Sequence, residues 1–343
     1  MSSESDFLPT EIADLPLLAI ASDLSAMAWT QMIAWRGSLG AGLDESVVDT
    51  KSSPNDLVTL ADAQIESLVR GFLAEVRPND LMIGEEGAAA LDPVEFFPDE
   101  FLAELRCFDP KAGRLVTRGE PDSRLEWHVD PIDGTVNYVR GIEHHAFSVG
   151  VCLAAPDGSR DVGGESTKGE EAGGESTGGE EAPAGRPDQR RWLFGLVASP
   201  GLNATWLGAE GLGSYRVDGR VGAGCESLPA QRLRGTPSGL SGRLLATGFA
   251  YTGSNRGPQL AKLENLMDGY DDIRRCGAAS VDLCMVAEGK VNSYAERGLG
   301  IYDYAGGAII AEEAGITVLR GGGGGPTAAA ATPAEAERLI AAI

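Results

Sequence analysis

The segment Trp127–Gly141 (WHVDPIDGTVNYVRG) constrains the fold of this chain more than any other. Asp130 and Asp133 flank Pro131, whose ring fixes its own φ and pushes the preceding residue towards an extended conformation. Gly134 then allows a tight turn that a residue with a side chain would resist. The pattern predicts two carboxylates that converge at the end of a strand, followed by backbone N–H groups at a turn.

Such an arrangement suits a phosphate group held next to a hard cation. Carboxylates bind hard cations, and the backbone N–H groups of Gly134 and Thr135 can bind phosphate oxygens. A structural alternative is a capped turn in which the aspartates only accept Asx hydrogen bonds. The segment by itself leaves both interpretations open.

Further acidic residues lie in two other parts of the chain. Glu85 and Glu86 follow the apolar, strand-like Leu81-Met82-Ile83, which places them at a second strand end. In the C-terminal third, Glu296 precedes Asp303, which we expect directly before a helix of small residues. An acid in that position can also simply interact with the helix dipole.

The alternation of apolar and polar residues predicts helices followed by mixed strands and then by α/β structure. We expect the helices at 15–35, from about 60 through 72, 277–288 and 304–314. We expect strands at 81–83, 127–129, 146–153, 192–199 and 291–294, with an antiparallel meander through 205–219. This order predicts an α/β or α+β enzyme of several layers, in which strand ends carry the site.

A nearly exact repeat interrupts this pattern. The decamer GGESTKGEEA at 163–172 is followed by GGESTGGEEA at 173–182, and the two differ only at Lys168 and Gly178. Two copies rich in Gly, Glu, Ser and Thr cannot bury a core. We predict a flexible acidic insert at about 156–189, and we assign no chemistry to its own GEE strings.

Composition narrows the functional classes. The net charge of −23 disfavours nucleic acid and anionic membranes as partners. The five cysteines show no CxxC spacing, so neither a disulfide framework nor a zinc site is expected, and the abundant carboxylates favour Mg²⁺. No uninterrupted apolar run reaches about 18 residues, and the acidic start lacks the basic region of a secretory signal, so we expect a cytoplasmic protein.

Taken together, these segments resemble the inositol monophosphatase family. The matching residues are KSSPNDLVTLAD at 51–62, GEE at 84–86, DPIDGTVNYVRG at 130–141, GAAS at 277–280, Glu296, and YDYAGGAIIAEEAG at 302–315. The resemblance covers roughly residues 15–342, apart from the loops near 88–124 and 156–189. It implies one domain over 1–343 with two sub-lobes, approximately 1–200 and 201–343.

The resemblance also implies a layered αβαβα sandwich, a homodimer, and about two or three Mg²⁺ ions that act on a small phosphorylated polyol. It implies that Glu85, Thr135 and Asp62 are catalytic, with Thr135 and Glu85 orienting the attacking water. The implied metal ligands are Glu85, Asp130, the carbonyl of Ile132, Asp133 and Asp303. The implied substrate-binding residues are Asp133, Gly134, Thr135, Gly277, Ala278, Ala279, Glu296 and Asp303.

One position departs from the family pattern, because Tyr302 stands where the family usually has Trp; we expect altered packing there rather than lost catalysis. His144 and His145 are expected to be structural, since hard cations do not require imidazole. Inositol monophosphate is the expected substrate. Histidinol phosphate, fructose 1,6-bisphosphate and a nucleotide 3′-phosphate remain alternatives within the same class. A non-catalytic regulatory or scaffold protein is the alternative from another class.

Overall fold

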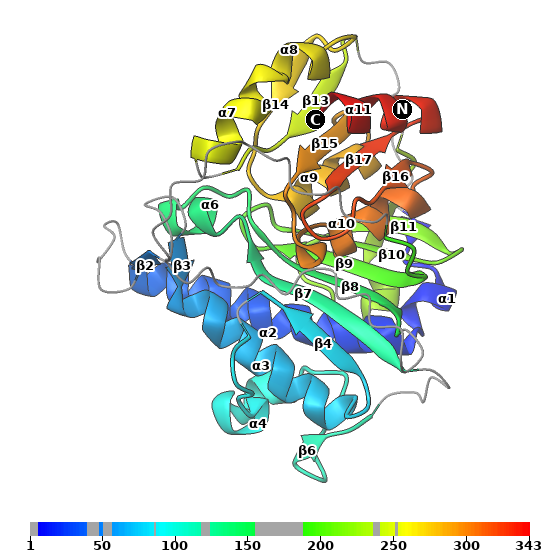
Figure 1. Cartoon of the computed structure of the whole chain (residues 1–343). Coiled ribbons are helices and arrows are strands. Elements are labelled where there is room, and N and C mark those ends of the chain that lie inside the picture. Colours follow the sequence, from blue (N-terminus) through cyan, green and yellow to red (C-terminus); the bar gives the residue numbers. More distant parts are fainter. Residues whose placement is uncertain are drawn as a thin grey trace.

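The computed structural model describes residues 6–39, 48–50, 57–85, 87–117, 124–154, 188–235, 241–250 and 253–343. Two sheets and three groups of helices alternate as five layers along the long direction of the molecule (Figure 1). The αβαβα sandwich expected from the resemblance is therefore confirmed. The predicted acidic insert lies outside the described residues except for its last two positions, and Glu86 lies outside them as well.

The first layer consists of the long helices α2 (Pro16–Leu39) and α3 (Leu60–Val76), which pack against one face of the larger sheet. Both helices were predicted from their apolar spacing, and both are confirmed. By length and composition alone, Pro16–Gly37 could also cross a membrane, but 72% of its most apolar stretch is buried inside the protein. That burial is typical of a core helix.

The larger sheet has eight strands in the order β1-β12-β11-β10-β9-β8-β7-β4. All its neighbouring strands are antiparallel except β4 and β7, which run parallel. Its strands are β1 (Asp6–Phe7), β4 (Leu81–Gly84), β7 (Leu125–Asp133), β8 (Ala146–Leu153), β9 (Trp192–Ser199), β10 (Ala204–Ala209), β11 (Gly213–Asp218) and β12 (Pro229–Arg232).

The smaller sheet has five strands in the order β14-β13-β15-β17-β16. They are β13 (Leu244–Thr247), β14 (Asp272–Arg274), β15 (Ser293–Arg297), β16 (Thr317–Leu319) and β17 (Pro326–Ala330). The division into two lobes near residue 200 stays a prediction. Strands β10, β11 and β12 extend the larger sheet as far as Arg232, and the smaller sheet begins at Leu244.

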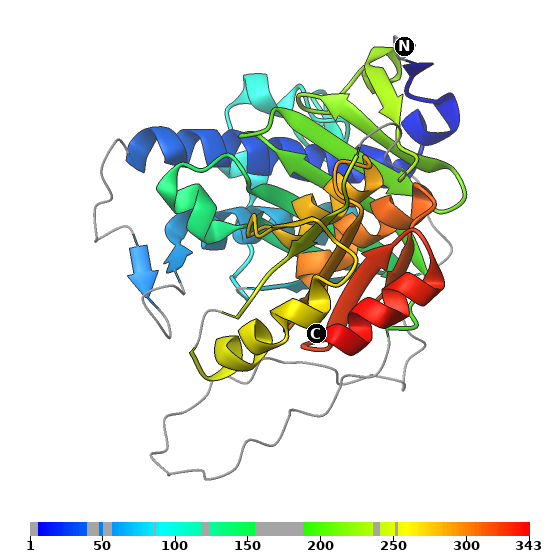
Figure 2. The ribbon, with the colours of Figure 1, turned by 90° about the horizontal axis from the view of Figure 1, so that it is seen from above.

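Helices α9 (Ala279–Ala287) and α10 (Ile301–Glu313) fill the layer between the two sheets. Helix α10 lies close to the larger sheet because glycines face it: a Cβ on Gly150 or Gly195 would collide with Ala305 or Ile309. Figure 2 shows α7 (Gly253–Ala261), α8 (Leu263–Leu266) and α11 (Pro333–Ala342) on the outer side of the smaller sheet.

Shorter elements complete the described chain. The region 88–124, expected to be a long loop, carries two short helices and a small hairpin. Within that region they are α4 (Pro93–Phe96), α5 (Asp99–Leu102), β5 (Phe108–Asp109) and β6 (Arg114–Leu115). The short elements elsewhere in the chain are α1 (Thr10–Ala13), β2 (Val48–Thr50), β3 (Leu57–Thr59), α6 (Thr135–Arg140) and a 3₁₀ turn at Cys225–Ser227.

Two predicted boundaries in the C-terminal third are displaced. The strand expected at 291–294 is β15 at Ser293–Arg297. Helix α10 begins at Ile301 rather than Tyr304, so Asp303 lies inside its first turn instead of before it. The physical reason is a capping interaction: Asp303 Oδ2 accepts a hydrogen bond of 2.6 Å from the N–H of Gly300.

Candidate active site

Acidic side chains from four separate segments interact at one end of strand β7. Asp130 and Asp133 lie on β7 itself, Asp62 in the first turn of α3, Glu85 directly after β4, and Asp303 in the first turn of α10. The charges of the other four all act on the carboxyl group of Asp130. The fold therefore brings together five of the acids that the sequence singled out.

Strand β7 departs from regular pairing where the site begins. Its register with β8 shifts between Asp130 and Asp133, the kind of irregularity that redirects a side chain next to an active site. Asp130 and Asp133 are both buried, at 2% and 7% exposure. Gly134 follows with a φ of +82°, a conformation that strongly favours glycine, and caps α6.

Asp133 joins this strand to the start of α9. Its Oδ1 accepts a hydrogen bond of 3.2 Å from the N–H of Ala279, and its Oδ2 accepts one of 2.7 Å from the N–H of Ser280. The Ser280 hydroxyl donates to the same Oδ2. Ala278 packs against Gly134. The predicted substrate-binding residues Gly277, Ala278 and Ala279 thus lie directly beside the turn at Gly134.

Thr135 connects the turn to α3. Its Oγ1 lies 2.9 Å from Oδ2 of Asp62 and 2.9 Å from the carbonyl oxygen of Ile132. A hydroxyl has one hydrogen to donate, and its lone pairs remain available to accept hydrogen bonds from a third group. Asp62 is buried at 2% exposure, so this link forms in the interior of the protein.

Glu85 is exposed and projects from the end of β4. The loop that carries it rests on the buried carboxyl group of Glu66, whose Oε1 accepts a hydrogen bond of 3.0 Å from the N–H of Ala88. Glu66 also presses against Gly84, because a Cβ added there would lie 2.6 Å from Glu66 Oε2. Helix α3 therefore holds the loop that carries Glu85 in place through the side chain of Glu66.

The electrostatics of the cluster favour a bound cation. Burial is the main cause of a pKa far above the ordinary value for Asp130, and the negative charges of Asp133, Glu85, Asp303 and Asp62 raise it further. The pKa of Asp303 is raised in the same way, mainly by burial and then by Glu85 and Asp133. Burial raises the pKa of Asp133 to about 6, although hydrogen bonds from Ser280 oppose the rise.

These residues fit a divalent metal ion. Among the described residues, Asp130 Oδ1 is a buried oxygen without a hydrogen-bond partner, which a metal–oxygen bond would satisfy. All the candidate donors are carboxylate or carbonyl oxygens, the ligand type that Mg²⁺ prefers. A cation placed among them would also remove the mutual repulsion that raises their pKa values.

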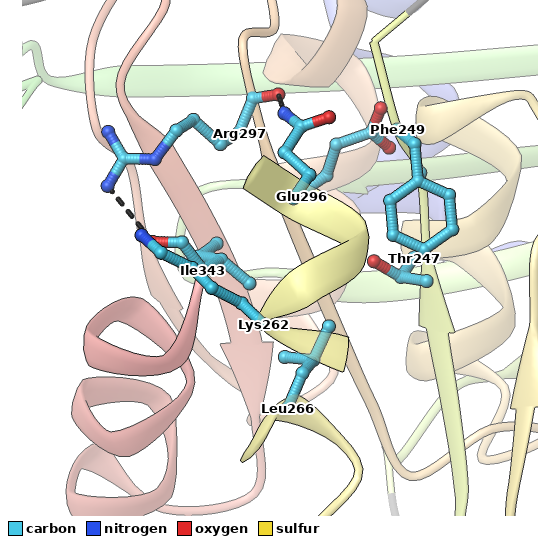
Figure 3. A pocket seen from close by; sticks show the side chains of 9 residues that line it. Thr247, Phe249, Lys262, Leu266, Glu296, Arg297 and Ile343 are labelled. Atoms are coloured by element: carbon cyan, nitrogen blue, oxygen red, sulfur yellow. Dashed lines mark hydrogen bonds between the residues drawn. The ribbon is translucent and has the colours of Figure 1, made fainter. Parts of the chain in front are cut away.

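Glu296 borders the site from β15 of the smaller sheet. Its carboxyl group lies against Gly248, and Tyr294 donates a hydrogen bond of 2.8 Å to its Oε2. Burial raises the pKa of Glu296 to about 7. Figure 3 shows the pocket that extends from Glu296 between Thr247, Phe249, Lys262, Leu266, Arg297 and Ile343. Glu296, which lines this pocket, also acts by its charge on Asp303 of the carboxylate cluster.

Sequence reasoning missed a contact that ties two loops of the site together. His144 Nε2 lies 3.0 Å from Oδ1 of the buried Asp282 on α9. The side-chain amide of Asn137 donates to the carbonyl oxygens of His144 and Cys276, at 2.6 and 2.8 Å. A histidine and an aspartate far apart in the sequence gave no signal for this pairing. The expected structural role of His144 agrees with these contacts.

Comparison with known proteins places the site in a family context. The profile of the inositol monophosphatase family matches residues 16–157 and 187–343. The protein named inositol-1-monophosphatase SuhB from Mycobacterium tuberculosis is 33% identical over 335 residues, which cover 95% of this chain and 93% of the relative. The Pasteurella multocida protein named Nus factor SuhB is 28% identical over 267 residues, 78% of this chain and 72% of that protein.

The solved structure of Mycobacterium tuberculosis SuhB superposes with a TM-score of 0.59 at 28% identity, over 95% of this chain and 94% of that one. Fold, family profile and relatives agree, and they support a phosphatase of a generally metal-dependent family. The chain belongs to the inositol monophosphatase family.

Proposed function

We propose that this protein is a Mg²⁺-dependent phosphomonoesterase that hydrolyses inositol monophosphate, or a closely similar phosphorylated polyol, to the free alcohol and phosphate. The observation that supports it most is the convergence of Asp62, Glu85, Asp130, Asp133 and Asp303 with the hydroxyl of Thr135. Regular packing does not require five carboxyl groups at one point, since like charges near one another cost free energy. Divalent metal ions bound among these groups would offset that repulsion.

Asp130, Asp133, Glu85, Asp303 and the carbonyl oxygen of Ile132 would hold the metal. When bound, Mg²⁺ supplies positive charge for the phosphate oxygens and makes a nearby water more acidic. The chain itself provides the orientation. With its hydrogen directed to Asp62, Thr135 Oγ1 can accept a hydrogen bond from the attacking water, and Glu85 can accept the other proton of that water.

The substrate would lie between the two loops that meet at Gly134. Backbone N–H groups of Gly134 and Thr135 would bind phosphate oxygens. Gly277, Ala278 and Ala279 would line the polyol side of the site, and Glu296 would accept hydrogen bonds from polyol hydroxyls. In the reaction, the water oxygen bonds to phosphorus while the bond from phosphorus to the ester oxygen breaks. The attacking water gives up a proton to Glu85 and then to solvent, and the leaving ester oxygen takes up a proton from solvent to become the alcohol.

A substrate panel tests this proposal. Released phosphate would be measured with Mg²⁺ for inositol 1-phosphate, histidinol phosphate, fructose 1,6-bisphosphate and a nucleotide 3′-phosphate. We expect the highest kcat/KM with inositol 1-phosphate. A higher value with histidinol phosphate would overturn the substrate assignment and leave the chemistry intact.

The second candidate is a regulatory or scaffold protein without catalysis, a possibility that the relatives named Nus factor SuhB favour. The intact set of acids and Thr135 weighs against it in this chain. A lack of hydrolysis across the whole panel with Mg²⁺ would support this candidate instead.

We further infer a cytoplasmic homodimer that binds neither nucleic acid nor membranes. The net charge of −23 supports the inference that the protein does not bind nucleic acid or anionic membranes. Light scattering after size-exclusion chromatography tests whether the protein is a dimer.

A further inference from the structure

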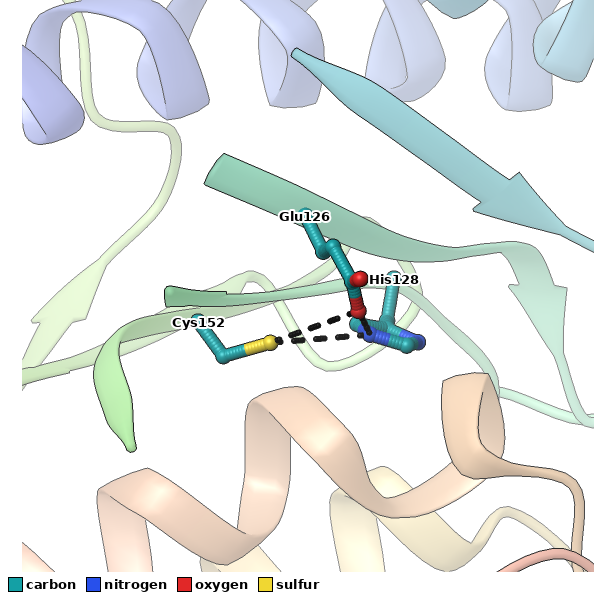
Figure 4. Close-up of side chains that lie close together, drawn as sticks. All are labelled: Glu126, His128 and Cys152. Carbon is teal, nitrogen blue, oxygen red and sulfur yellow. Dashed lines mark hydrogen bonds and ion pairs between the residues drawn. The ribbon is translucent and has the colours of Figure 1, made fainter. Parts of the chain in front are cut away.

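A second group of potential metal ligands lies on the larger sheet, towards the opposite end of β7 from the turn at Gly134. Glu126 and His128 are two residues apart on β7, so they face the same side, and Cys152 on β8 pairs directly with Glu126. Figure 4 shows the three side chains pointing towards one another between the sheet and the helices beside it. His128 and Cys152 are both fully buried, and the Glu126 side chain is 12% exposed.

The spacing of the three atoms matches the corners of a metal tetrahedron. Glu126 Oε2 lies 3.4 Å from His128 Nε2. Cys152 Sγ lies 3.7 Å from His128 Nε2 and 3.9 Å from Glu126 Oε2. Around a tetrahedral Zn²⁺, with bonds of about 2.0–2.3 Å, neighbouring ligand atoms are separated by roughly 3.3–3.6 Å. A movement of a few tenths of an ångström would bring all three into bonding distance.

Hydrogen bonding explains this cluster less well. The contact between His128 and Glu126, at 3.4 Å, is longer than an ordinary N–H···O hydrogen bond. Among the described residues, His128 Nδ1 is buried without any hydrogen-bond partner. Its other ring nitrogen, Nε2, faces both Glu126 and Cys152, so Nε2 is the atom that could bind a cation.

The charges around the cluster allow a divalent cation. Arg190 lies 3.4 Å from Glu126 Oε2, and its guanidinium is also paired with Asp188 at 3.2 Å. The positive charge of Arg190 is therefore shared between two carboxylates. With Cys152 as thiolate, the charges of Glu126, Asp188, Cys152, Arg190 and one divalent ion cancel. Without the ion, burial and the charge of Glu126 raise the pKa of the Cys152 thiol and keep it protonated.

We propose that Glu126, His128 and Cys152 form a second metal site, separate from the carboxylate cluster, which binds Zn²⁺. One sulfur, one nitrogen and one oxygen ligand suit Zn²⁺ and not Mg²⁺, which prefers oxygen alone. Three protein ligands leave a fourth position for water. This proposal is independent of the proposed phosphatase activity.

Co²⁺ provides the test, because a thiolate bound to Co²⁺ gives a charge-transfer absorption that carboxylates cannot give. The full-length protein would be freed of metal with a chelator and titrated with Co²⁺ in excess Mg²⁺. We expect the absorption to appear, to saturate at about one ion per chain, and to disappear when Zn²⁺ is added. Because the thiol must lose its proton, the affinity should rise about tenfold per pH unit below the thiol pKa.

Variants identify the site. Cys152→Ser should abolish the absorption and weaken Zn²⁺ binding by more than about 100-fold. That loss is larger than the one caused by removing a residue that only hydrogen-bonds to a metal ligand. Cys276→Ser is the matched control, because Cys276 also lies near a histidine and an aspartate, and it should leave the absorption unchanged. Glu126→Gln, which keeps the shape of the side chain, should weaken binding without abolishing the absorption.

Absence of the absorption in the parent protein would overturn the proposal. So would its survival in Cys152→Ser, or its loss in Cys276→Ser. If Cys152→Ser does not fold, X-ray absorption spectroscopy of the Zn²⁺-loaded parent decides. One sulfur neighbour at about 2.3 Å supports the site, and a shell of light atoms only contradicts it.

Discussion

Thr135 Oγ1 lies 2.9 Å from Oδ2 of Asp62, a residue 73 positions earlier in the chain. The contact joins the turn after β7 to the first turn of α3. Whether its hydrogen goes to Asp62 or to the carbonyl oxygen of Ile132, also 2.9 Å away, the lone pairs of Thr135 can accept a hydrogen bond from another group. The proposed orientation of the attacking water depends on this geometry.

Replacing this hydroxyl should therefore reduce turnover without unfolding the protein. Thr135→Val keeps the shape of the side chain but cannot orient water, and we expect kcat to fall by about 100-fold or more with little change in KM. Thr135→Ser keeps the hydroxyl and should stay within about tenfold of the parent. Steady-state phosphate release measures both. Equal losses in the two variants would show that the methyl group matters and the hydroxyl does not.

Asp130→Asn tests the proposed metal site. Asparagine is nearly isosteric but removes a buried negative charge, so we expect kcat to fall by at least about 100-fold. Loss of repulsion from Asp133, Glu85, Asp303 and Asp62 should raise the thermal midpoint in chelator above that of the parent. Mg²⁺ should stabilise the parent much more than the variant.

Differential scanning fluorimetry with and without Mg²⁺ measures the stability effect. Asp272→Asn is the control, because Asp272 is exposed and pairs with Arg274 at the surface. That variant should behave like the parent in both measurements. Near-normal hydrolysis by Asp130→Asn would mean that the aspartates of this segment are structural.

Glu296→Gln should show a dependence on pH. Gln keeps an acceptor for the Tyr294 hydroxyl but loses the charge, so we expect KM for inositol 1-phosphate to rise about tenfold or more, with kcat nearly unchanged. The pKa of Glu296 in the folded protein is about 7, above the ordinary value of 4.5. The parent should therefore bind substrate better as the pH rises through about 7, and the variant should lack that part of the change.

The same pKa predicts an effect on stability. Because the pKa of Glu296 is higher in the folded state, this residue makes a contribution to the free energy of unfolding that is fully present below about pH 4.5. That contribution is lost as the pH rises through about 7. Gln stays neutral, so the variant should be more stable than the parent above pH 7, by on the order of 1–3 kcal/mol. Urea unfolding at pH 5 and pH 8 measures this difference. A variant that is less stable at pH 8 would contradict the burial of the charge.

Deletion of residues 161–182 should leave Mg²⁺-dependent kcat/KM within a few-fold of the parent. The strands on either side, β8 and β9, are already paired, and the N–H of Leu153 donates a hydrogen bond of 3.1 Å to the carbonyl oxygen of Arg191. The ends of the shortened connection therefore remain adjacent. Changes in loop length also cost little, about 0.6 kcal/mol per doubling. Loss of activity with an unchanged thermal midpoint would show that this segment contributes to the site.

Local sequence determined the elements of this fold and the residues of the proposed site. Apolar spacing predicted α2 and α3, and the Asp-Pro-x-Asp-Gly pattern predicted a strand followed by a tight turn. Both predictions hold because they depend on neighbours a few residues apart. The start of α10 was misplaced, because a capping contact decided it.

Tertiary structure alone decided which groups meet. Asp133 accepts hydrogen bonds from the start of α9, 146 residues later in the chain. His144 contacts Asp282, which is 138 residues later in the chain. Glu126, His128 and Cys152 come together only because β8 pairs with β7 in one register, and a shift by one residue would turn Cys152 to the other face. Sequence patterns report local periodicity, whereas strand register and helix packing set the distances on which binding chemistry depends.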